Sequence, residues 1–279
     1  MKEVGYYNGE IAPLSEMKVP MLDRALYFGD GCYDATMVKN GKVHNFDGHV
    51  NRFFNSARLL RIELPFTREE LLAEFNKVIE QFDDDEGFLY WQVSRGTAPR
   101  DHAFPEGVKP NLMITLTQHG TTPTTTEFKA VTMEDKRFTY CNIKTLNLLP
   151  NCLVTQRGKE AGANEIIFVR DGYVTEMAHS NVSFLVDGVF VHHPFDDKIL
   201  PGISLKNMIS ACKKMGIPVQ ARALTQVEAM NADELIASSS STFCCRINTV
   251  DGIPVGGKDI ELFNKIQSAV YAEYDEDTK

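Results

Sequence analysis

The sequence of 279 residues predicts a mixed α+β fold, in which strands joined by tight turns alternate with amphipathic helices. Four Asn-Gly or Asp-Gly pairs fall between strand-like segments, and such pairs are the strongest short hairpin signal in a sequence. They are Asn8-Gly9, Asn40-Gly41, Asp171-Gly172 and Asp187-Gly188. The strands are therefore expected to pair as hairpins, and a doubly wound parallel sheet is not expected.

The N-terminal part is expected to contain two hairpins, two helices and two further strands. Asp47 is interpreted as the N-cap of the first helix, because apolar residues follow it at helical spacing. Thr67 and Glu70 form a capping box, which predicts a second amphipathic helix. Strands over residues 88–94 and 111–117 are rich in aromatic or alternating apolar side chains.

A polar stretch near the middle of the chain suggests a division into domains. Residues 118–127, QHGTTPTTTE, contain no large apolar side chain and several Thr, Gly and Pro. The expected organisation is an N-terminal α+β domain (1–118), an interdomain linker (119–127) and a C-terminal domain (128–279). A surface loop within a single domain is the alternative interpretation of the same letters.

The C-terminal part is predicted to be rich in strands, with three helices. Strands are expected over residues 128–133, 164–170, 173–177, 181–186, 189–193, 217–222, 234–238 and 243–250. Helices are expected over 152–161, ended by Gly162, over 204–215, ended by Gly216, and around Ile260, Phe263, Ile266 and Val270.

Composition and charge exclude several classes of protein. The net charge of −9 and the pI near 5.3 disfavour a general affinity for nucleic acid or anionic membrane. No apolar run is long enough to cross a bilayer and the N-terminus lacks a signal-peptide core, so a cytoplasmic location is expected. The six cysteines form no C-x-x-C pair and are expected to be free thiols. No metal site is expected, because adjacent His192 and His193 on a strand would face opposite sides.

Lys144 stands in the segment IKTLNLLPN, among mainly apolar neighbours. One interpretation is a lysine that lays its methylenes on apolar surface and extends its ammonium to water. The other is a lysine whose charge is destabilised by these neighbours, so that it serves as a nucleophilic amine.

Two further segments suggest an anion-binding site. Gly202, Ile203 and Ser204 precede an expected helix, whose first amides would face an anion such as phosphate. Ser204 acting as an ordinary N-cap explains the same letters. The run ASSSST, residues 237–242, offers hydroxyls and amides, although a turn stabilised by hydroxyl-to-backbone bonds is the alternative.

Two more segments carry charged groups suited to binding a substrate and a cofactor ring. Arg95, Arg100 and His102 lie in a loop with Gly and Pro, where an arginine could grip a carboxylate through two parallel hydrogen bonds. Glu176 ends a short strand and could pair with a protonated ring nitrogen. A chance surface loop and a solvated glutamate are the alternatives. Together, the lysine, the anion site, the carboxylate and the arginine loop are the groups that pyridoxal phosphate chemistry on amino acids requires.

Seven motifs occur in the order seen in the fold-type IV pyridoxal phosphate enzymes, and the sequence most resembles the D-amino acid aminotransferases over nearly its whole length. The motifs are FGDGCYDATMV, HVNRF, SRGTAPRDH, IKTLNLL, VTEMAHSN, LPGIS and SSSST. Branched-chain aminotransferases and aminodeoxychorismate lyases share the lysine and glutamate segments but are less similar around RGTAPRDH. The resemblance implies a smaller N-terminal α/β sandwich-like domain and a larger, β-barrel-like C-terminal domain that binds the cofactor, pyridoxal 5′-phosphate.

The resemblance implies particular roles for the cofactor-binding residues. Lys144 would form the Schiff base with the cofactor and move the proton between the substrate α-carbon and cofactor C4′. Glu176 would keep the pyridine nitrogen protonated. Arg52 would pair with the phosphate, aided by the amides of Ile203 and Ser204 and by Ser240.

Tyr33, Arg100 and His102 are implied to receive the substrate α-carboxylate, with the last two reaching over from a partner subunit. A homodimer with active sites completed by both chains is therefore expected. Two departures from the family pattern affect the expected pocket. Asp34 replaces the usual glutamate, and Met177, Ala178 and His179 replace a run of small residues.

The expected activity is ping-pong transamination from a D-amino acid, such as D-alanine or D-glutamate, to a 2-oxo acid such as 2-oxoglutarate or pyruvate. Three alternatives remain open. They are aminodeoxychorismate lyase-like cleavage, an L-specific branched-chain aminotransferase and a non-catalytic protein that binds pyridoxal phosphate.

Overall fold

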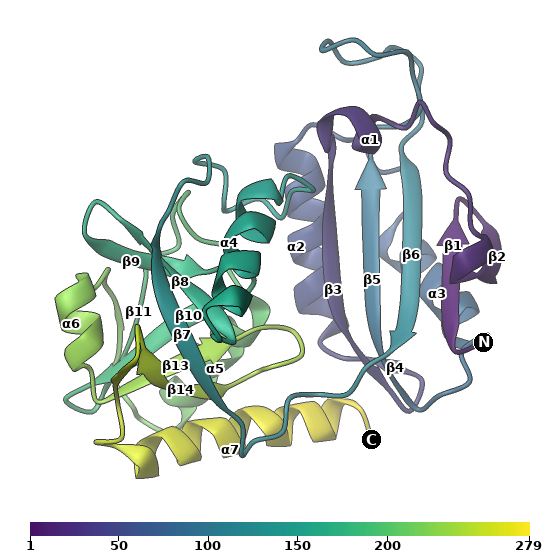
Figure 1. Ribbon diagram of the computed structural model, residues 1–279. Helices are drawn as coiled ribbons and strands as arrows, with labels where there is room; N and C mark the ends of the chain where they lie inside the picture. The colour runs from purple at the N-terminus through teal and green to yellow at the C-terminus, as the bar shows by residue number, and fades with distance from the viewer. The chain divides into compact units, whose positions relative to one another are not determined.

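A computed structural model describes residues 1–279, and the chain divides into two units (Figure 1). The first unit contains Met1–Gly120, Ile143–Asn147 and Tyr274–Lys279, and the second contains Thr121–Asn142 and Leu148–Glu273. Each unit combines helices with a sheet in which antiparallel pairs predominate, so the predicted α+β class with two domains is confirmed. The exact limits of the linker stay a prediction.

The first unit contains a six-stranded antiparallel sheet with the order β2-β1-β6-β5-β3-β4. The strands are β1 Glu3–Tyr7, β2 Glu10–Pro13, β3 Gly31–Lys39, β4 Lys42–Val43, β5 Glu86–Ser94 and β6 Asn111–Gln118. Both predicted hairpins are confirmed, because Asn8-Gly9 joins β1 to β2 and Asn40-Gly41 joins β3 to β4. All four turn residues have positive φ, as the tight hairpin turn requires.

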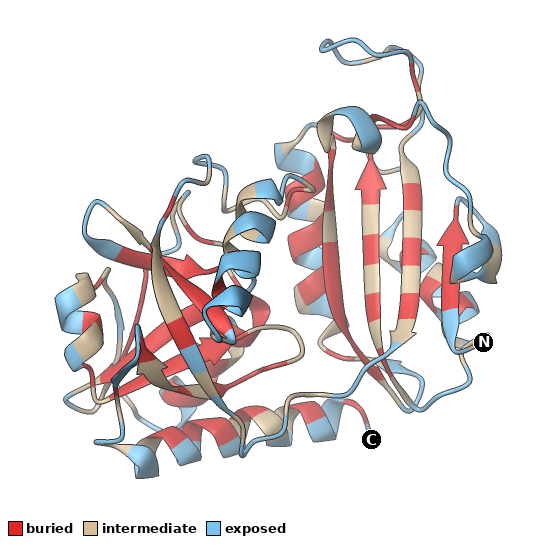
Figure 2. Ribbon diagram, viewed as in Figure 1, coloured by how far each residue is buried: buried red, intermediate tan, exposed pale blue.

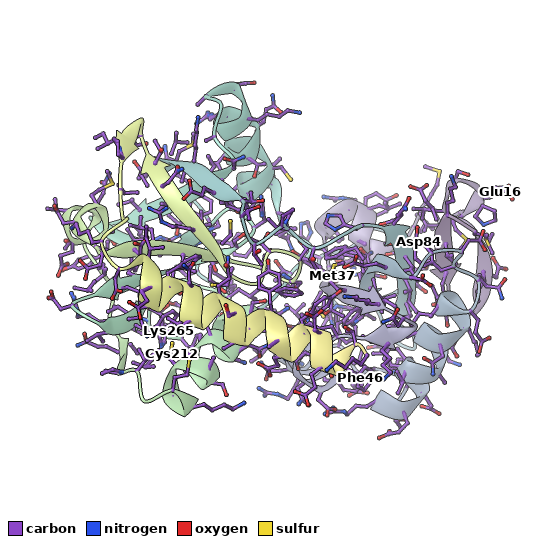
Figure 3. The ribbon with its side chains drawn as sticks, turned by 90° about the horizontal axis from the view of Figure 1, so that it is seen from below. Glu16, Met37, Phe46, Asp84, Cys212 and Lys265 are labelled. Carbon is purple, nitrogen blue, oxygen red and sulfur yellow. The ribbon has the colours of Figure 1, made fainter.

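The helices α2 (Phe46–Leu59) and α3 (Arg68–Ile79) cover one face of this sheet (Figure 1). Along β5 and β6 buried and half-buried residues alternate, because successive side chains of a strand point to opposite faces (Figure 2). The core beneath the helices includes Phe53, Phe75 and Trp91. Figure 3 labels Met37 of β3 and Phe46, which opens α2.

The capping box of Thr67 and Glu70 is confirmed, but the prediction of Asp47 as an N-cap is wrong. Asn45 caps α2, and its side chain accepts a hydrogen bond from the Gly48 amide at 3.1 Å. Asn45 adopts a left-handed conformation, which asparagine tolerates better than most residues. Asp47 lies in the first helical turn and pairs with Arg68.

Two short elements of the first unit were not predicted. They are the 3₁₀ turn η1 (Leu14–Glu16) and the helix α1 (Arg24–Phe28). The side chain of Asp23 caps α1 by accepting from the Ala25 amide at 2.9 Å, and Gly29 ends the helix in the left-handed conformation. Figure 1 shows α1 at the end of the sheet where β5 runs into the loop that precedes β6.

The segment Ile143–Asn147 pairs with the start of β3, although it lies more than a hundred residues later in the chain. The amide of Tyr33 donates to the carbonyl of Lys144 at 2.9 Å, and the amide of Leu146 donates to the carbonyl of Gly31 at 3.1 Å. Gly31 has no side chain, and a Cβ there would lie only 2.8 Å from the Leu146 side chain. This pairing places Lys144 next to β3.

The second unit contains a nine-stranded mixed sheet, in which β15 pairs with β14 beside the path β12-β11-β10-β13-β14-β7-β8-β9. The sheet curls, and β9 contacts β10. The strands are β7 Glu127–Glu134, β8 Glu165–Arg170, β9 Tyr173–Met177, β10 Asn181–Val186, β11 Val189–His192, β12 Val219–Ala221, β13 Glu234–Ser238, β14 Cys245–Val250 and β15 Ile253–Pro254. The turns at Asp171-Gly172 and Asp187-Gly188 are confirmed as hairpins.

Four helices accompany this sheet, and α7 extends from the second unit into the C-terminal segment of the first. They are α4 Leu149–Glu160, α5 Ile203–Lys214, α6 Gln226–Asn231 and α7 Ile260–Asp277. The first begins three residues before the predicted start at Cys152, because Pro150 is tolerated in a first helical turn. The short α6 was not predicted, although Thr225 and Glu228 form a capping box. No helix combines the length and apolar character that a membrane crossing requires.

Candidate active site

Lys144 lies beside Tyr33 in the first unit. Its Nζ is 4.4 Å from the centroid of the Tyr33 ring, within the range of a cation–π contact. The Lys144 amide donates to Oγ of Ser56 on α2 at 3.3 Å, so the backbone is held from a second side. The side chain is half-buried. The structure therefore brings together two predicted site residues, an amine and a phenol.

Arg52 is held by a buried carboxylate that the sequence marked only as a departure from the family pattern. Its Nε and Nη2 donate to the two oxygens of Asp34 at 2.8 and 2.7 Å, in a two-pronged pair. Nδ1 of His49 lies 2.8 Å from Oδ1 of Asp34. The spacing of HVNRF places His49 and Arg52 on one face of α2, which explains the joint contact. Nη1 of Arg52 makes no hydrogen bond within the chain.

The Asp34 cluster has unusual protonation equilibria. Burial alone would raise the pKa of Asp34, but the charge of Arg52 and its hydrogen bonds, followed by those of His49, hold that pKa well below its ordinary value. Burial lowers the pKa of His49 from 6.5 to about 4, because loss of water outweighs the attraction of Asp34. The imidazole is therefore neutral near pH 7.

The free energy of unfolding is expected to fall as the pH is lowered from 6.5 towards about 4. In this window the unfolded chain binds a proton at His49 that the folded chain does not, so acid favours unfolding. This one group contributes a slope of up to about 1.4 kcal/mol per pH unit. Urea unfolding over this range measures the slope.

The variant His49→Gln is expected to lose that part of the pH dependence. The matched control is His119→Gln, because His119 is exposed and contacts only the ring of Phe88. An unchanged slope in His49→Gln would contradict the assignment.

Arg100 and His102 lie on the loop after β5, and both are exposed. The guanidinium of Arg100 is 5.2 Å from the centroid of Phe28, and the ring of His102 is also 5.2 Å from it. Neither side chain makes a hydrogen bond or ring contact with Tyr33 within the chain. The structure thus brings Arg100 and His102 together but does not join them to Tyr33. Arg95 of the same loop is buried and paired with Asp30.

Glu176 is buried near the end of β9 in the second unit. Its Oε2 accepts hydrogen bonds from Nδ2 of Asn181 and from the amide of Leu200, both at 2.9 Å. Its Oε1 is paired with Arg137. These donors fix the orientation of the carboxylate.

The start of α5 and the serine-rich turn meet in the second unit. Oγ of Ser204 donates to the carbonyl of Ser239 at 2.7 Å, so the interpretation of Ser204 as an N-cap is wrong. Gly202 occupies that position without a side-chain bond, and the amides of Ile203 and Ser204 have no acceptor within the chain. Ser240 lies in the adjoining turn, is half-buried and makes no hydrogen bond.

The donors in each unit fit the groups of pyridoxal phosphate. In the second unit, the free amides at the start of α5 suit a phosphate. Ser238 at the end of β13 carries a buried hydroxyl without a partner, and a Cβ at Gly202 would lie only 1.9 Å from Oδ1 of Asn181. In the first unit, the unpaired Nη1 of Arg52 suits the same kind of anion, and the amine of Lys144 suits an aldehyde.

Several supporting residues could not be identified from the sequence. Arg137 lies in the charged segment MEDKRF, which looks like an ordinary solvent-exposed turn, yet it is buried between Asp135 and Glu176. Asn181 stands within the motif VTEMAHSN, but its bond to Glu176 depends on how the chain returns after the turn at residues 178–180.

The three residues after Glu176 that depart from the family pattern differ in their surroundings. Met177 and Ala178 are buried. Nδ1 of His179 lies 2.9 Å from Oε2 of the buried Glu165, which also accepts from Oγ of Ser180 at 2.9 Å.

No group of three or more His, Cys, Asp and Glu side chains is arranged to hold a metal ion.

The curled sheet, the lysine amine, the donors suited to an anion and the buried glutamate fit a pyridoxal phosphate enzyme. A family model described as amino-transferase class IV matches residues 31–250. A D-alanine aminotransferase of Bacillus licheniformis is 33% identical over 267 residues, which cover 95% of this chain and 94% of the relative. A D-alanine aminotransferase of Staphylococcus haemolyticus is 35% identical over 254 residues, which cover 90% of each.

Solved structures show the same fold at lower identity. The branched-chain amino acid aminotransferase of Escherichia coli is similar with a TM-score of 0.89 and 22% identity, over 100% of this chain and 97% of that one. A hypothetical aminotransferase from Mycobacterium tuberculosis gives a TM-score of 0.80 in its apo form and 0.79 in its PLP-bound form, each at 22% identity. These two cover 97% of this chain and 99% of theirs. The chain therefore belongs to the class IV aminotransferase family and is a pyridoxal-phosphate-dependent aminotransferase.

Proposed function

We propose that the protein transfers the amino group of D-amino acids, with D-alanine and D-glutamate as natural substrates, to 2-oxo acids in a ping-pong reaction. The observation that carries this proposal is the amine of Lys144 held beside Tyr33, next to β3. The D-alanine aminotransferases at 33–35% identity over nearly the whole chain support the D-configuration. The structure of the branched-chain amino acid aminotransferase of Escherichia coli matches at 22% identity, which supports the fold alone.

Each proposed role follows from the chemistry of the side chain. Bound pyridoxal phosphate supplies an aldehyde that takes up the amino group and a ring that withdraws electrons from the substrate α-carbon. Lys144 provides the amine that holds the aldehyde and carries the proton to and from that carbon. Arg52, with the amides of Ile203 and Ser204 and the hydroxyl of Ser240, binds phosphate oxygens.

The carboxylate of Glu176 accepts a hydrogen bond from the protonated ring nitrogen. Arg137 and Asn181 keep this carboxylate in one orientation. Such fixed polar groups act without reorganising during the reaction.

Substrate handedness follows from how the α-carboxylate is bound. Tyr33, Arg100 and His102 are proposed to hold it, so that only one enantiomer directs its α-hydrogen to Lys144. We further propose that the protein is a cytoplasmic homodimer, in which Arg100 and His102 contribute to the active site of the partner subunit. The support is that both are exposed and make no contact with Tyr33 of their own chain. Large apolar side chains are also exposed on the segment that hydrogen-bonds to their loop, including Met21 at 82% and Leu26 at 60%.

The products distinguish this activity from its alternatives. Purified protein loaded with pyridoxal phosphate is expected to convert D-alanine and 2-oxoglutarate into pyruvate and D-glutamate in equal amounts. L-alanine and L-leucine are expected to give no product. Reaction with L-leucine alone would support the branched-chain alternative, and release of pyruvate from an aminodeoxychorismate-like substrate without acceptor would support the lyase. Cofactor binding without any turnover would leave only the non-catalytic alternative.

A further inference from the structure

We propose that Arg24 is a positioning residue that holds the turn Arg100-Asp101-His102 in the shape required to bind the substrate α-carboxylate. The inference rests on the proposed function, in which Arg100 and His102 bind that carboxylate. It adds a residue from a different part of the chain, the short helix α1, that touches neither substrate nor cofactor in this role.

Arg24 bonds directly to the middle of the turn. Its Nη1 donates to the backbone carbonyl of Asp101 at 2.6 Å, and Asp101 stands between Arg100 and His102. Its Nε donates to Oδ2 of Asp30 at 2.7 Å. The side chain of Arg24 is buried, so both bonds are shielded from competing water. One guanidinium thus links the turn to the residues just before β3.

Phe28, on the same helix, forms a second support. Its ring lies 4.8 Å from the guanidinium of Arg24, and both Arg100 and His102 lie 5.2 Å from its centroid. The helix α1 therefore contacts the turn through a hydrogen bond to the turn's backbone and through an aromatic ring beside the side chains of Arg100 and His102.

The base of the loop is fixed without the side chain of Arg24. Arg95 makes a two-pronged pair with Asp30, with bonds of 2.9 to 3.1 Å. The amide of Arg24 donates to the carbonyl of Gly96 at 3.0 Å, and the amide of Ala98 donates to that of Leu22 at 3.1 Å. These bonds hold the loop up to residue 98. The guanidinium of Arg24 extends the support to residue 101.

This support matters because Arg100 and His102 are exposed and no burial restricts them. A cavity of about 260 Å³, lined by Arg24, Phe28 and His102 among others, adjoins the turn, so packing around the turn is incomplete. Without a fixed backbone the two side chains would lose rotamer and backbone freedom on binding a carboxylate, which weakens binding.

The variant Arg24→Lys tests the inference. Lysine keeps the charge but cannot direct two fixed N–H groups at Asp30 and at the Asp101 carbonyl. Asp30 keeps its pair with Arg95, so no buried carboxylate loses all its partners and folding is expected. The KM for D-alanine is expected to rise about tenfold, the effect of one lost hydrogen bond from a charged donor. The kcat and the amount of bound pyridoxal phosphate are expected to stay within about twofold, since the variant leaves the proton-moving groups intact.

Hydrogen exchange provides a readout independent of activity. Amides of residues 99–103 are expected to exchange faster in Arg24→Lys than in the unchanged protein. Phe28→Leu, which removes the ring under the turn, is expected to raise the KM in the same direction. The matched control is Arg58→Lys, because Arg58 is exposed on α2 and bonds only to Asn55.

An unchanged KM in Arg24→Lys, or unchanged exchange over residues 99–103, would overturn the inference. A proportional loss of kcat and bound cofactor would overturn it too, because that pattern indicates a general structural defect. Absence of D-alanine turnover in the unchanged protein contradicts the proposed function instead, and hydrogen exchange still shows whether Arg24 holds the turn.

Discussion

Lys144→Ala is expected to abolish transamination, with a loss in turnover of at least about 10³-fold. Alanine removes the amine that is proposed to bind the cofactor aldehyde and to move the substrate proton, and no other lysine makes a contact with the Tyr33 ring. The visible absorbance of the covalently bound cofactor is expected to disappear with the activity. Absorbance spectra and initial rates with D-alanine and 2-oxoglutarate measure both effects.

The matched control is Lys77→Ala, because Lys77 is exposed on α3 and pairs only with Glu74. This variant is expected to keep its spectrum and rate. Borohydride reduction of the loaded protein, followed by peptide mapping, is expected to place the cofactor mass on Lys144. A cofactor-bearing peptide from any other lysine would contradict the assignment.

Asp34→Asn is expected to lower the free energy of unfolding by about 3–5 kcal/mol. Asp34 is fully buried and is the carboxylate partner of both Arg52 and His49. Its loss of charge leaves the guanidinium of Arg52 buried without compensation. Because Arg52 is the proposed phosphate ligand, the affinity for pyridoxal phosphate is expected to fall as well. Urea unfolding and cofactor titration measure the two effects.

Asp47→Asn is the matched control for Asp34→Asn. Asp47 also pairs with an arginine, but its side chain is 82% exposed, and exposed pairs contribute at most about 1 kcal/mol. Equal stability of Asp34→Asn and Asp47→Asn would contradict the account of the buried cluster. Asp34→Glu, which restores the residue usual in the family, is expected to keep the charge but to strain a site shaped for the shorter side chain.

Local signals in the sequence were enough to predict most elements of the fold. The Asn-Gly and Asp-Gly turns were predicted correctly because few other residues adopt the positive φ values that such turns need. The capping box at Thr67 has a similarly local cause. The cap of α2 was assigned wrongly because Asn45 and Asp47 are both good caps, and only the backbone conformation distinguishes them. Helices as short as α1 and α6 leave too little periodicity to detect.

Features that depend on contacts between distant segments were beyond local reasoning. The pairing of Ile143–Asn147 with β3 joins residues more than a hundred positions apart. The buried pair of Arg137 and Glu176 gives no pattern in the letters of either segment. Serine is a common N-cap residue, yet the hydroxyl of Ser204 donates to the carbonyl of Ser239, because the serine-rich turn lies beside it. The role proposed for Arg52 came from the family resemblance alone, whereas the roles of Lys144 and Glu176 were also suggested by their own segments. All three stay predictions.

We propose that pyridoxal phosphate held by Lys144 accepts amino groups from D-amino acids only. The most direct test of this central claim is the visible spectrum of the loaded protein during addition of D-alanine and, in a separate sample, L-alanine, without any 2-oxo acid. We expect D-alanine to remove the visible band of the bound cofactor while L-alanine leaves it unchanged. Loss of the band with L-alanine alone, or no loss with either isomer, would contradict the account.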